Sequence, residues 1–287
     1  MTSTCWQVTF YLSQQPSVKF EEFMNEFFEV FSQNYQSDGY DEFIGYSGTP
    51  LDEEQMIKVA NSYGITLPKY KIEKLESENW LKDYVIEFPS FEIADFCIYG
   101  IHEKETPQTD KIPLQIYAAT AFGSNHQTTQ GCINAISELN KQGFIPDKIL
   151  DIGTGSGILS LCSAKLWTKT SIIAGDIDDE AVIVTSGNAK NNNLNHQIKA
   201  IQSDGYNNPL IKQSVPYDLI LSNILANPLI SFAENLQQNL KQNGYCILSG
   251  FVDNQVDDVI SAHEKLGLKL IKLYSIDNWR TALMQKA

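Results

Sequence analysis

Three glycines stand at alternate positions between two apolar runs in the stretch ILDIGTGSGILSL, residues 149–161. The run before them predicts a buried strand, and the apolar pattern after them predicts a helix. Gly153, Gly155 and Gly157 permit the sharp turn between the two and leave the first helix amides free to face a ligand. Asp176 ends the next apolar run, about 20 residues later, where a carboxylate can accept hydrogen bonds from both hydroxyls of a ribose. These residues predict a ligand site at the ends of two neighbouring strands.

The elements around these residues alternate regularly from residue 148 onward. Short runs rich in β-branched residues predict strands, and longer segments such as DEAVIVTSGNAKNN and PLISFAENLQQNLKQ predict helices between them. This order predicts an α/β fold: a mostly parallel sheet with helices on both faces and a ligand crevice beyond the carboxyl ends of the strands. The last segment, LGLKLIKLYSIDNWRTALMQ, has room for two strands and no helix, so we expect a terminal antiparallel hairpin.

The first 90 residues have a different pattern. TCWQVTFYL and YKIEKLE alternate like half-exposed strands, whereas VKFEEFMNEFFEVF and DEEQMIKVANSYG show helical spacing. We therefore expect a smaller α+β domain over residues 1–90, with the stripe of Phe20, Phe23, Phe27 and Phe31 in its core. Residues 91–120 are expected to be a linker and lead-in to a second domain over residues 121–287.

The composition excludes several classes of protein. With 287 residues, of which 43% are hydrophobic and 20% charged, the chain is globular. No apolar run is long enough to cross a membrane and no secretory signal is present, so a cytoplasmic location is expected. The five cysteines and four histidines are scattered, which favours buried free thiols and gives no support to a metal site.

The acidic charge is concentrated in one part of the chain. Residues 1–110 hold 20 acidic and 7 basic residues, whereas residues 111–287 hold 15 acidic and 14 basic. Such an excess fits either a well-solvated surface or a docking surface for a basic partner. Direct nucleic-acid binding is disfavoured, because Arg280 is the single arginine in the chain and clustered basic residues are needed to neutralise phosphates.

The glycine spacing also distinguishes between cofactors. A dinucleotide fingerprint requires its third glycine or alanine at position 158, which is Ile158 here. The pattern Asp151-x-Gly153-x-Gly155-x-Gly157 instead resembles the first motif of Rossmann-like S-adenosylmethionine methyltransferases. Asp204 follows the third strand, where this class contacts the adenine amino group, although a turn-capping role is the alternative.

Several further motifs extend the resemblance over about residues 95–287. Together with DIGTGSGIL, the stretches AFGSNHQTTQGC, GDID, LSNILANPL and ILSGFVDNQ resemble the ribosomal protein L11 methyltransferase family. This resemblance implies that the N-terminal domain grips the basic ribosomal protein. The second domain would transfer methyl groups from S-adenosylmethionine to lysine side chains and the N-terminal amine. The expected cofactor contacts are Phe122, Thr129, Asp151, Gly153, Gly155, Asp176, Ile177, Asp204 and Asn223.

Asn223 is also the expected catalytic residue. It occupies the position after the fourth strand where amino-group methyltransferases orient the acceptor nitrogen, and no general base is expected, because a desolvated channel lowers the pKa of a lysine. The family's Phe-Gly-Thr-Gly loop is one residue shorter here, and Asn125 and His126 are expected to shape and anchor that turn. An NAD-dependent oxidoreductase on the same sheet and a binding module that has lost catalysis are the alternatives.

Overall fold

A computed structural model describes most of the chain, which divides into two compact units, residues 1–84 and residues 85–287. The described residues are 4–12, 17–28, 30–35, 41–47, 51–76, 88–103, 105–117 and 127–287. The boundary between the units therefore falls a few residues before the expected end of the first domain. No described helix is both long enough and apolar enough to span a bilayer.

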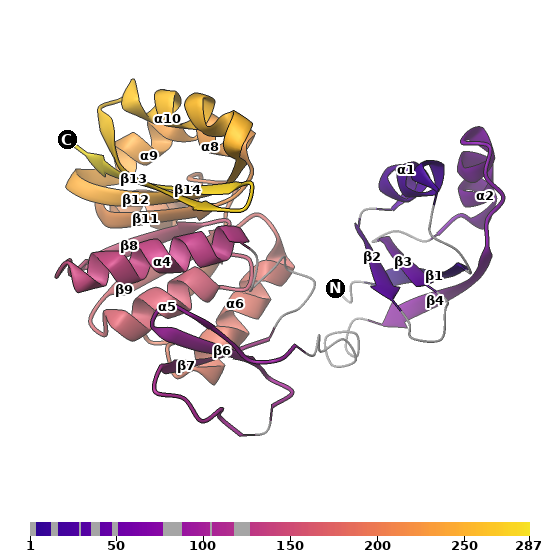
Figure 1. The fold of residues 1–287 in the computed structure, drawn as a ribbon, viewed down its shortest axis with the longest axis horizontal. Coiled ribbons are helices and arrows are strands. Elements are labelled where there is room, and N and C mark those ends of the chain that lie inside the picture. Colours follow the sequence, from indigo (N-terminus) through magenta and orange to yellow (C-terminus); the bar gives the residue numbers. More distant parts are fainter. Residues whose placement is uncertain are drawn as a thin grey trace. The chain divides into compact units, whose positions relative to one another are not determined.

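The described part of the first unit is a four-stranded antiparallel sheet with two helices (Figure 1). Its elements are β1 (Thr4–Leu12), α1 (Val18–Phe27), β2 (Val30–Tyr35), β3 (Asp41–Ser47), α2 (Glu53–Ser62) and β4 (Lys69–Glu76). The strand order β2-β3-β1-β4 is that of a ferredoxin-like βαββαβ unit. Val8 and Phe10 of β1 pack with α1 and α2 in one buried core, so the expected α+β architecture is observed.

Helix α1 ends sooner than the spacing of its aromatic residues predicts. Phe20 and Phe23 are buried in the core as expected, and Phe27 stacks on Phe23 with ring centroids 5.9 Å apart. The chain leaves the helix at Phe28, and Phe31 lies in β2. The prediction of a helix through Phe31 was therefore wrong, because pairing of β2 with β3 overrides the local helical pattern.

The second unit contains a three-stranded and a seven-stranded sheet. The first segment forms β5 (Phe91–Ile93), β6 (Phe96–Gly100) and β7 (Ile112–Ile116). The larger sheet has its strands in the order β10-β9-β8-β11-β12-β14-β13. Its elements are α4 (Gln127–Lys141), β8 (Lys148–Ile152), α5 (Ile158–Leu166), β9 (Ser171–Asp176), α6 (Asp179–Asn191), β10 (Ile198–Gln202), α7 (Pro209–Ser214), β11 (Tyr217–Asn223), α8 (Ala226–Ser231), α9 (Ala233–Asn239), β12 (Leu240–Val252), η1 (Asp253–Gln255), α10 (Val256–Glu264), β13 (Leu268–Ile276) and β14 (Trp279–Lys286).

The large sheet confirms the predicted α/β architecture. Strands β8 to β12 pair in parallel, while β14 pairs antiparallel with both β12 and β13. Successive side chains of β11 point to opposite faces of the sheet. Leu219 and Leu221 pack in the core beneath α4 and α5, and Ile220 packs in the core beneath α8 and α10. Both faces are thus covered by helices (Figure 1), as a buried parallel sheet requires.

Two local predictions differ from the structure. The segment expected as one helix after residue 228 is divided into α8 and α9 at Phe232, whose ring packs edge-on against Tyr206. Residues 91–116, expected as linker and lead-in, form three strands whose side chains join a core of the second unit. The cysteines whose side chains the structure describes, Cys97, Cys132, Cys162 and Cys246, are buried and free, as predicted, and burial raises the pKa of each thiol.

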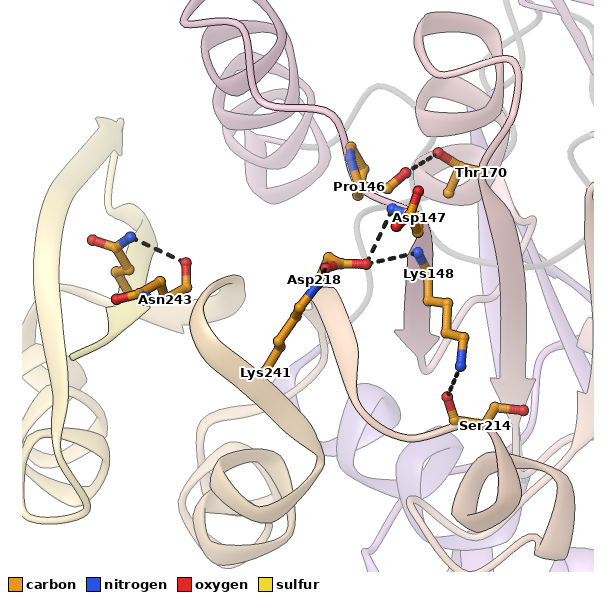
Figure 2. A network of polar contacts seen from close by, with 9 residues as sticks. Pro146, Asp147, Lys148, Thr170, Ser214, Asp218, Lys241 and Asn243 are labelled. Carbon is orange, nitrogen blue, oxygen red and sulfur yellow. Dashed lines mark hydrogen bonds and ion pairs between the residues drawn. The ribbon is translucent and has the colours of Figure 1, made fainter.

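A polar network around Asp218 holds the amino-terminal edge of the sheet (Figure 2). Asp218 Oδ2 accepts hydrogen bonds from the backbone N–H groups of Asp147 (3.0 Å) and Lys148 (2.9 Å), and Oδ1 accepts from Lys241 Nζ (2.6 Å). The side chain of Asp218 is 13% exposed. Burial by itself would raise its pKa, but Lys241 and the two backbone donors outweigh burial and hold the pKa below its usual value.

Replacing Asp218 by alanine should therefore lower the free energy of unfolding at neutral pH by about 1.5–3 kcal/mol. Because the folded-state pKa is depressed, this stabilisation is present above the unfolded-state pKa of about 3.9 and is lost as pH falls through the folded-state pKa. Urea unfolding of both proteins across this range measures the difference. A difference that stayed constant at acidic pH would contradict this role of the carboxylate.

Candidate cofactor site

The turn after β8 is built from three glycines in the left-handed region. The φ angles of Gly153, Gly155 and Gly157 are +73°, +56° and +80°, a conformation that L-residues with a side chain adopt only with strain. A Cβ atom on Gly153 would lie 2.2 Å from Ile224 Cγ2, whereas one on Gly155 would meet nothing within 4 Å. Gly153 thus permits close packing of the turn, and Gly155 faces open space.

Asp176 ties this turn to the end of the neighbouring strand. Its Oδ2 atom accepts a hydrogen bond of 2.9 Å from the backbone N–H of Gly155, and its Oδ1 atom accepts one of 3.2 Å from the N–H of Asp178. The side chain is half-buried at the carboxyl end of β9. The carboxylate is therefore fixed by backbone donors, and its remaining acceptor positions can receive hydroxyl groups.

A cavity of about 510 Å³ opens at these strand ends, at the edge of the sheet opposite the Asp218 network. Of the residues expected at the cofactor, Thr129, Gly153, Gly155, Asp176 and Asn223 line it. The other lining residues are Thr128, Thr154, Ser156, Ile158, Leu159, Asp178, Ala181, Ile224, Leu225, Gly250 and Trp279. Two carboxylates and no lysine, arginine or histidine stand among these described residues, a balance that suits a ligand with positive charge.

The end of β11 also contributes to the lining of the cavity. The Asn223 side-chain nitrogen donates to Thr129 Oγ1 at 3.3 Å, which turns its Oδ1 atom the other way. Thr129 lies in the first turn of α4 and is buried. Leu225, two residues after Asn223, is 71% exposed although it lines the cavity. A carboxamide and an apolar side chain thus both line the cavity at the end of β11.

Asp151 supports the glycine turn from beneath the cavity. Its Oδ2 atom accepts hydrogen bonds from Ser160 Oγ (2.6 Å) and Thr154 Oγ1 (2.9 Å). The side chain is 1% exposed, and burial raises its pKa to about 6, against the lowering effect of the two hydroxyls. Oδ1 has no partner among the described residues. Asp151 does not line the cavity, and the structure shows it bonded to Thr154, which does.

The remaining expected site residues are not among those that line the cavity in the described part of the chain. Ile177 is 68% exposed, Asp204 is also exposed, and neither lines the cavity. Phe122, Asn125 and His126 lie outside the described residues. The other eleven lining residues were not among the contacts expected from the sequence. Leu225 follows β11 and Gly250 lies in β12, both within quoted motifs, whereas Trp279 reaches the cavity because β14 pairs with β12.

Gly250 has a steric role that can be measured. Its φ is +98°, and a Cβ atom there would lie 2.1 Å from the backbone oxygen of Ile224. Gly143 offers a matched control, because its φ is +83° and a Cβ atom would meet nothing within 4 Å. We expect Gly143→Ala to cost about 1–2 kcal/mol of stability from backbone strain. Gly250→Ala should cost about 1–3 kcal/mol more, because the Ile224 backbone must move.

Thermal unfolding of the two variants measures this difference in stability. Equal losses in Gly143→Ala and Gly250→Ala would show that the contact with Ile224 is relieved without cost.

Potential metal ligands do not gather at this cavity. No three histidine, cysteine, aspartate or glutamate side chains in the described part of the chain are placed to hold a metal ion. The polar groups of the cavity are instead hydroxyls, amides, backbone groups and the two carboxylates.

Three features define the class of Rossmann-like methyltransferases. They are the parallel sheet with an inserted antiparallel strand, β14, the glycine turn after β8, and the carboxylate of Asp176 at the end of β9. The comparisons with known proteins agree. The family model for ribosomal protein L11 methyltransferase (PrmA) matches residues 9–287. The chain therefore belongs to the ribosomal protein L11 methyltransferase family.

Individual relatives support this assignment over most of the chain. A ribosomal protein L11 methyltransferase of Brucella suis is 31% identical over 267 residues, covering 88% of this chain and 92% of that protein. A ribosomal protein L11 methyltransferase of Bradyrhizobium diazoefficiens is 32% identical over 213 residues, covering 74% of this chain and 72% of that protein. The crystal structure of a ribosomal protein L11 methylase from Lactobacillus delbrueckii superposes with a TM-score of 0.58 at 26% identity, covering 67% of this chain and 93% of that one.

Proposed function

We propose that this enzyme transfers methyl groups from S-adenosylmethionine to lysine side chains, the N-terminal amine, or both, of ribosomal protein L11. The observation that carries the proposal is the cavity at the strand ends, which is lined by both Asp176 and Asn223 and holds two carboxylates without a basic side chain among the residues described. S-adenosylmethionine carries a positive sulfonium and a ribose, so these residues fit it. When bound, it supplies an activated methyl group.

The roles proposed for the side chains follow from their positions. Asp176 binds the ribose hydroxyls, since backbone donors already fix its orientation. Asn223 directs its Oδ1 atom at the acceptor amine, because its nitrogen is bonded to Thr129. Ile224 and Leu225 line the same cavity and exclude water, which favours the neutral amine that can attack the methyl group. Positioning and desolvation therefore account for the chemistry without a dedicated base.

The acidic charge of residues 1–110 supports the proposed partner. Ribosomal proteins that bind RNA are basic, so an excess of 20 acidic over 7 basic residues would raise the rate at which such a substrate is captured. The first unit holds 14 of these acidic residues and 6 of the basic ones. We propose that it contributes most of this attraction and the recognition of the substrate, and that the enzyme acts in the cytoplasm, where ribosomal proteins are made.

Calorimetry followed by mass spectrometry tests the function. The purified protein is titrated with S-adenosylmethionine and, separately, with NAD, and is then incubated with S-adenosylmethionine and recombinant unmethylated L11. We expect the protein to bind S-adenosylmethionine and not NAD, and to methylate L11 stepwise. Binding of NAD would favour the oxidoreductase, and cofactor binding without methylation would favour a module that has lost catalysis.

Salt separates recognition of the substrate from binding of the cofactor. The Debye length falls from about 10 Å at 0.1 M to about 3 Å at 1 M salt. Turnover efficiency on L11 should therefore fall as salt rises, while affinity for S-adenosylmethionine changes little. If salt left the turnover efficiency unchanged, the acidic excess would be a solvated surface only.

A further inference from the structure

Two asparagine side chains, Asn188 of α6 and Asn192 at its C-terminal cap, pair with the open edge of β7 and with the residue that follows it, as a neighbouring strand would. Asn192 Oδ1 accepts from the backbone N–H of Gln115 (3.0 Å), and Asn192 Nδ2 donates to the Gln115 carbonyl (2.7 Å). One helical turn earlier, Asn188 Oδ1 accepts from the N–H of Tyr117 (2.7 Å), and Nδ2 donates to the Tyr117 carbonyl (3.2 Å). The two side chains thus make the same contact with alternate residues of one extended segment.

Asn188 differs from Asn192 in the partner of its second donated hydrogen bond, since Asn192 Nδ2 donates to the carbonyl oxygen of Asn188, at 2.8 Å, at the end of the same helix. Asn188 Nδ2 instead donates to the carbonyl oxygen of Ser156, at 2.9 Å, in the glycine turn that lines the cavity. Asn188 is fully buried, and the three bonds occupy both of its amide hydrogens and its oxygen. A single carboxamide therefore joins α6, the end of β7 and the glycine turn.

Thr185, one turn earlier on the same face of α6, reinforces this contact. Its hydroxyl donates to the carbonyl oxygen of Gly155 at 2.9 Å, and it is also fully buried. The approach is possible because Gly157 has no side chain: a Cβ atom there would lie 2.8 Å from Thr185 Cγ2. Two successive carbonyls of the turn, those of Gly155 and Ser156, are therefore held from one helix.

These bonds complete the restraint of the turn. On its other side, the N–H of Gly155 is bonded to Asp176, and the N–H groups of Gly153 and Thr154 both donate to the carbonyl of Gly175. The three glycines make this segment costly to hold in one conformation, because glycine loses the most backbone entropy on ordering. Buried side-chain donors to its carbonyls fix that conformation before any ligand arrives, which lowers the cost of binding.

We propose that Asn188 is a positioning residue for the cofactor, assisted by Thr185: it sets the peptide groups of Gly155 and Ser156 in the conformation that binds S-adenosylmethionine. This inference rests on the proposed function of the cavity. It predicts that the donor capacity of residue 188 controls affinity for the cofactor, whereas that of residue 192 controls stability alone.

The matched variants Asn188→Asp and Asn192→Asp test this proposal. Each replaces a buried carboxamide by a carboxylate of the same shape that cannot donate, and each therefore loses two donated hydrogen bonds. Both should lower the melting temperature. Only Asn188→Asp should raise the dissociation constant of S-adenosylmethionine, by about tenfold, and raise its KM with little change in kcat at saturating cofactor.

Thr185→Val and Thr185→Ser provide a second pair if Asn188→Asp does not fold. Valine has the shape of threonine without the donor to Gly155, and serine keeps the hydroxyl. We expect weaker cofactor binding in Thr185→Val and wild-type affinity in Thr185→Ser. Wild-type affinity in Thr185→Val, or equal affinity in Asn188→Asp and Asn192→Asp, would overturn the positioning role. Failure of the wild-type protein to bind S-adenosylmethionine would overturn the proposed function itself.

Discussion

Replacing Asn223 by alanine should lower the rate of methyl transfer to L11 about a hundredfold. The dissociation constant of S-adenosylmethionine should change by less than about threefold. The Asn223 side chain lines the cavity, and its bond to Thr129 fixes the direction of Oδ1. If that oxygen aligns the acceptor amine, its loss affects the reacting geometry, which is sensitive to displacements of about 1 Å. Single-turnover rates and calorimetry measure the two effects separately.

The control for Asn223 is an exposed asparagine of the same unit. Asn191→Ala, at the end of α6, should leave both the rate and the affinity unchanged. Equal losses of rate and affinity in Asn223→Ala would instead place Asn223 among the cofactor contacts. A normal rate in the folded variant would remove Asn223 from the proposed mechanism.

The second large effect is expected at Asp176. Asp176→Ala removes the acceptor proposed for the ribose hydroxyls and the partner of the Gly155 N–H. Because a hydrogen bond to a charged group contributes about 1.5–3 kcal/mol, affinity for S-adenosylmethionine should fall by roughly 10- to 150-fold. Calorimetric titration measures the loss directly, and circular dichroism establishes that the variant is folded.

Asp110→Asn is the matched change for this titration. Asp110 is exposed and lies outside the cavity, so its replacement removes one negative charge without touching the site. We expect wild-type affinity in Asp110→Asn. Unchanged affinity in a folded Asp176→Ala protein would contradict the assignment of the ribose contact and, with it, the orientation proposed for the cofactor.

The sequence by itself determined the features that depend on neighbours in the chain. Gly153, Gly155 and Gly157 predicted the turn because glycine adopts left-handed φ angles without strain. The structure has all three glycines in that region. Asp176 was placed because the apolar run before it ends at that residue, and parallel strands bring their carboxyl ends to one edge. The terminal hairpin followed from the absence of room for a helix. Each of these inferences needed only a local pattern and the chirality of the polypeptide.

Tertiary structure alone decided the features that join distant segments. The pairing of β2 with β3 ended α1 before Phe31, against the local helical spacing. Trp279 reaches the cavity because β14 inserts between β12 and β13, a choice between alternative strand orders that periodicity does not encode. Asn188 contacts Tyr117 and Ser156, residues separated from it by 71 and 32 positions. Buried between three elements, the carboxamide of Asn188 has no water with which to form hydrogen bonds, so its oxygen and nitrogen bond to protein groups. Only the folded chain specifies which groups are buried together.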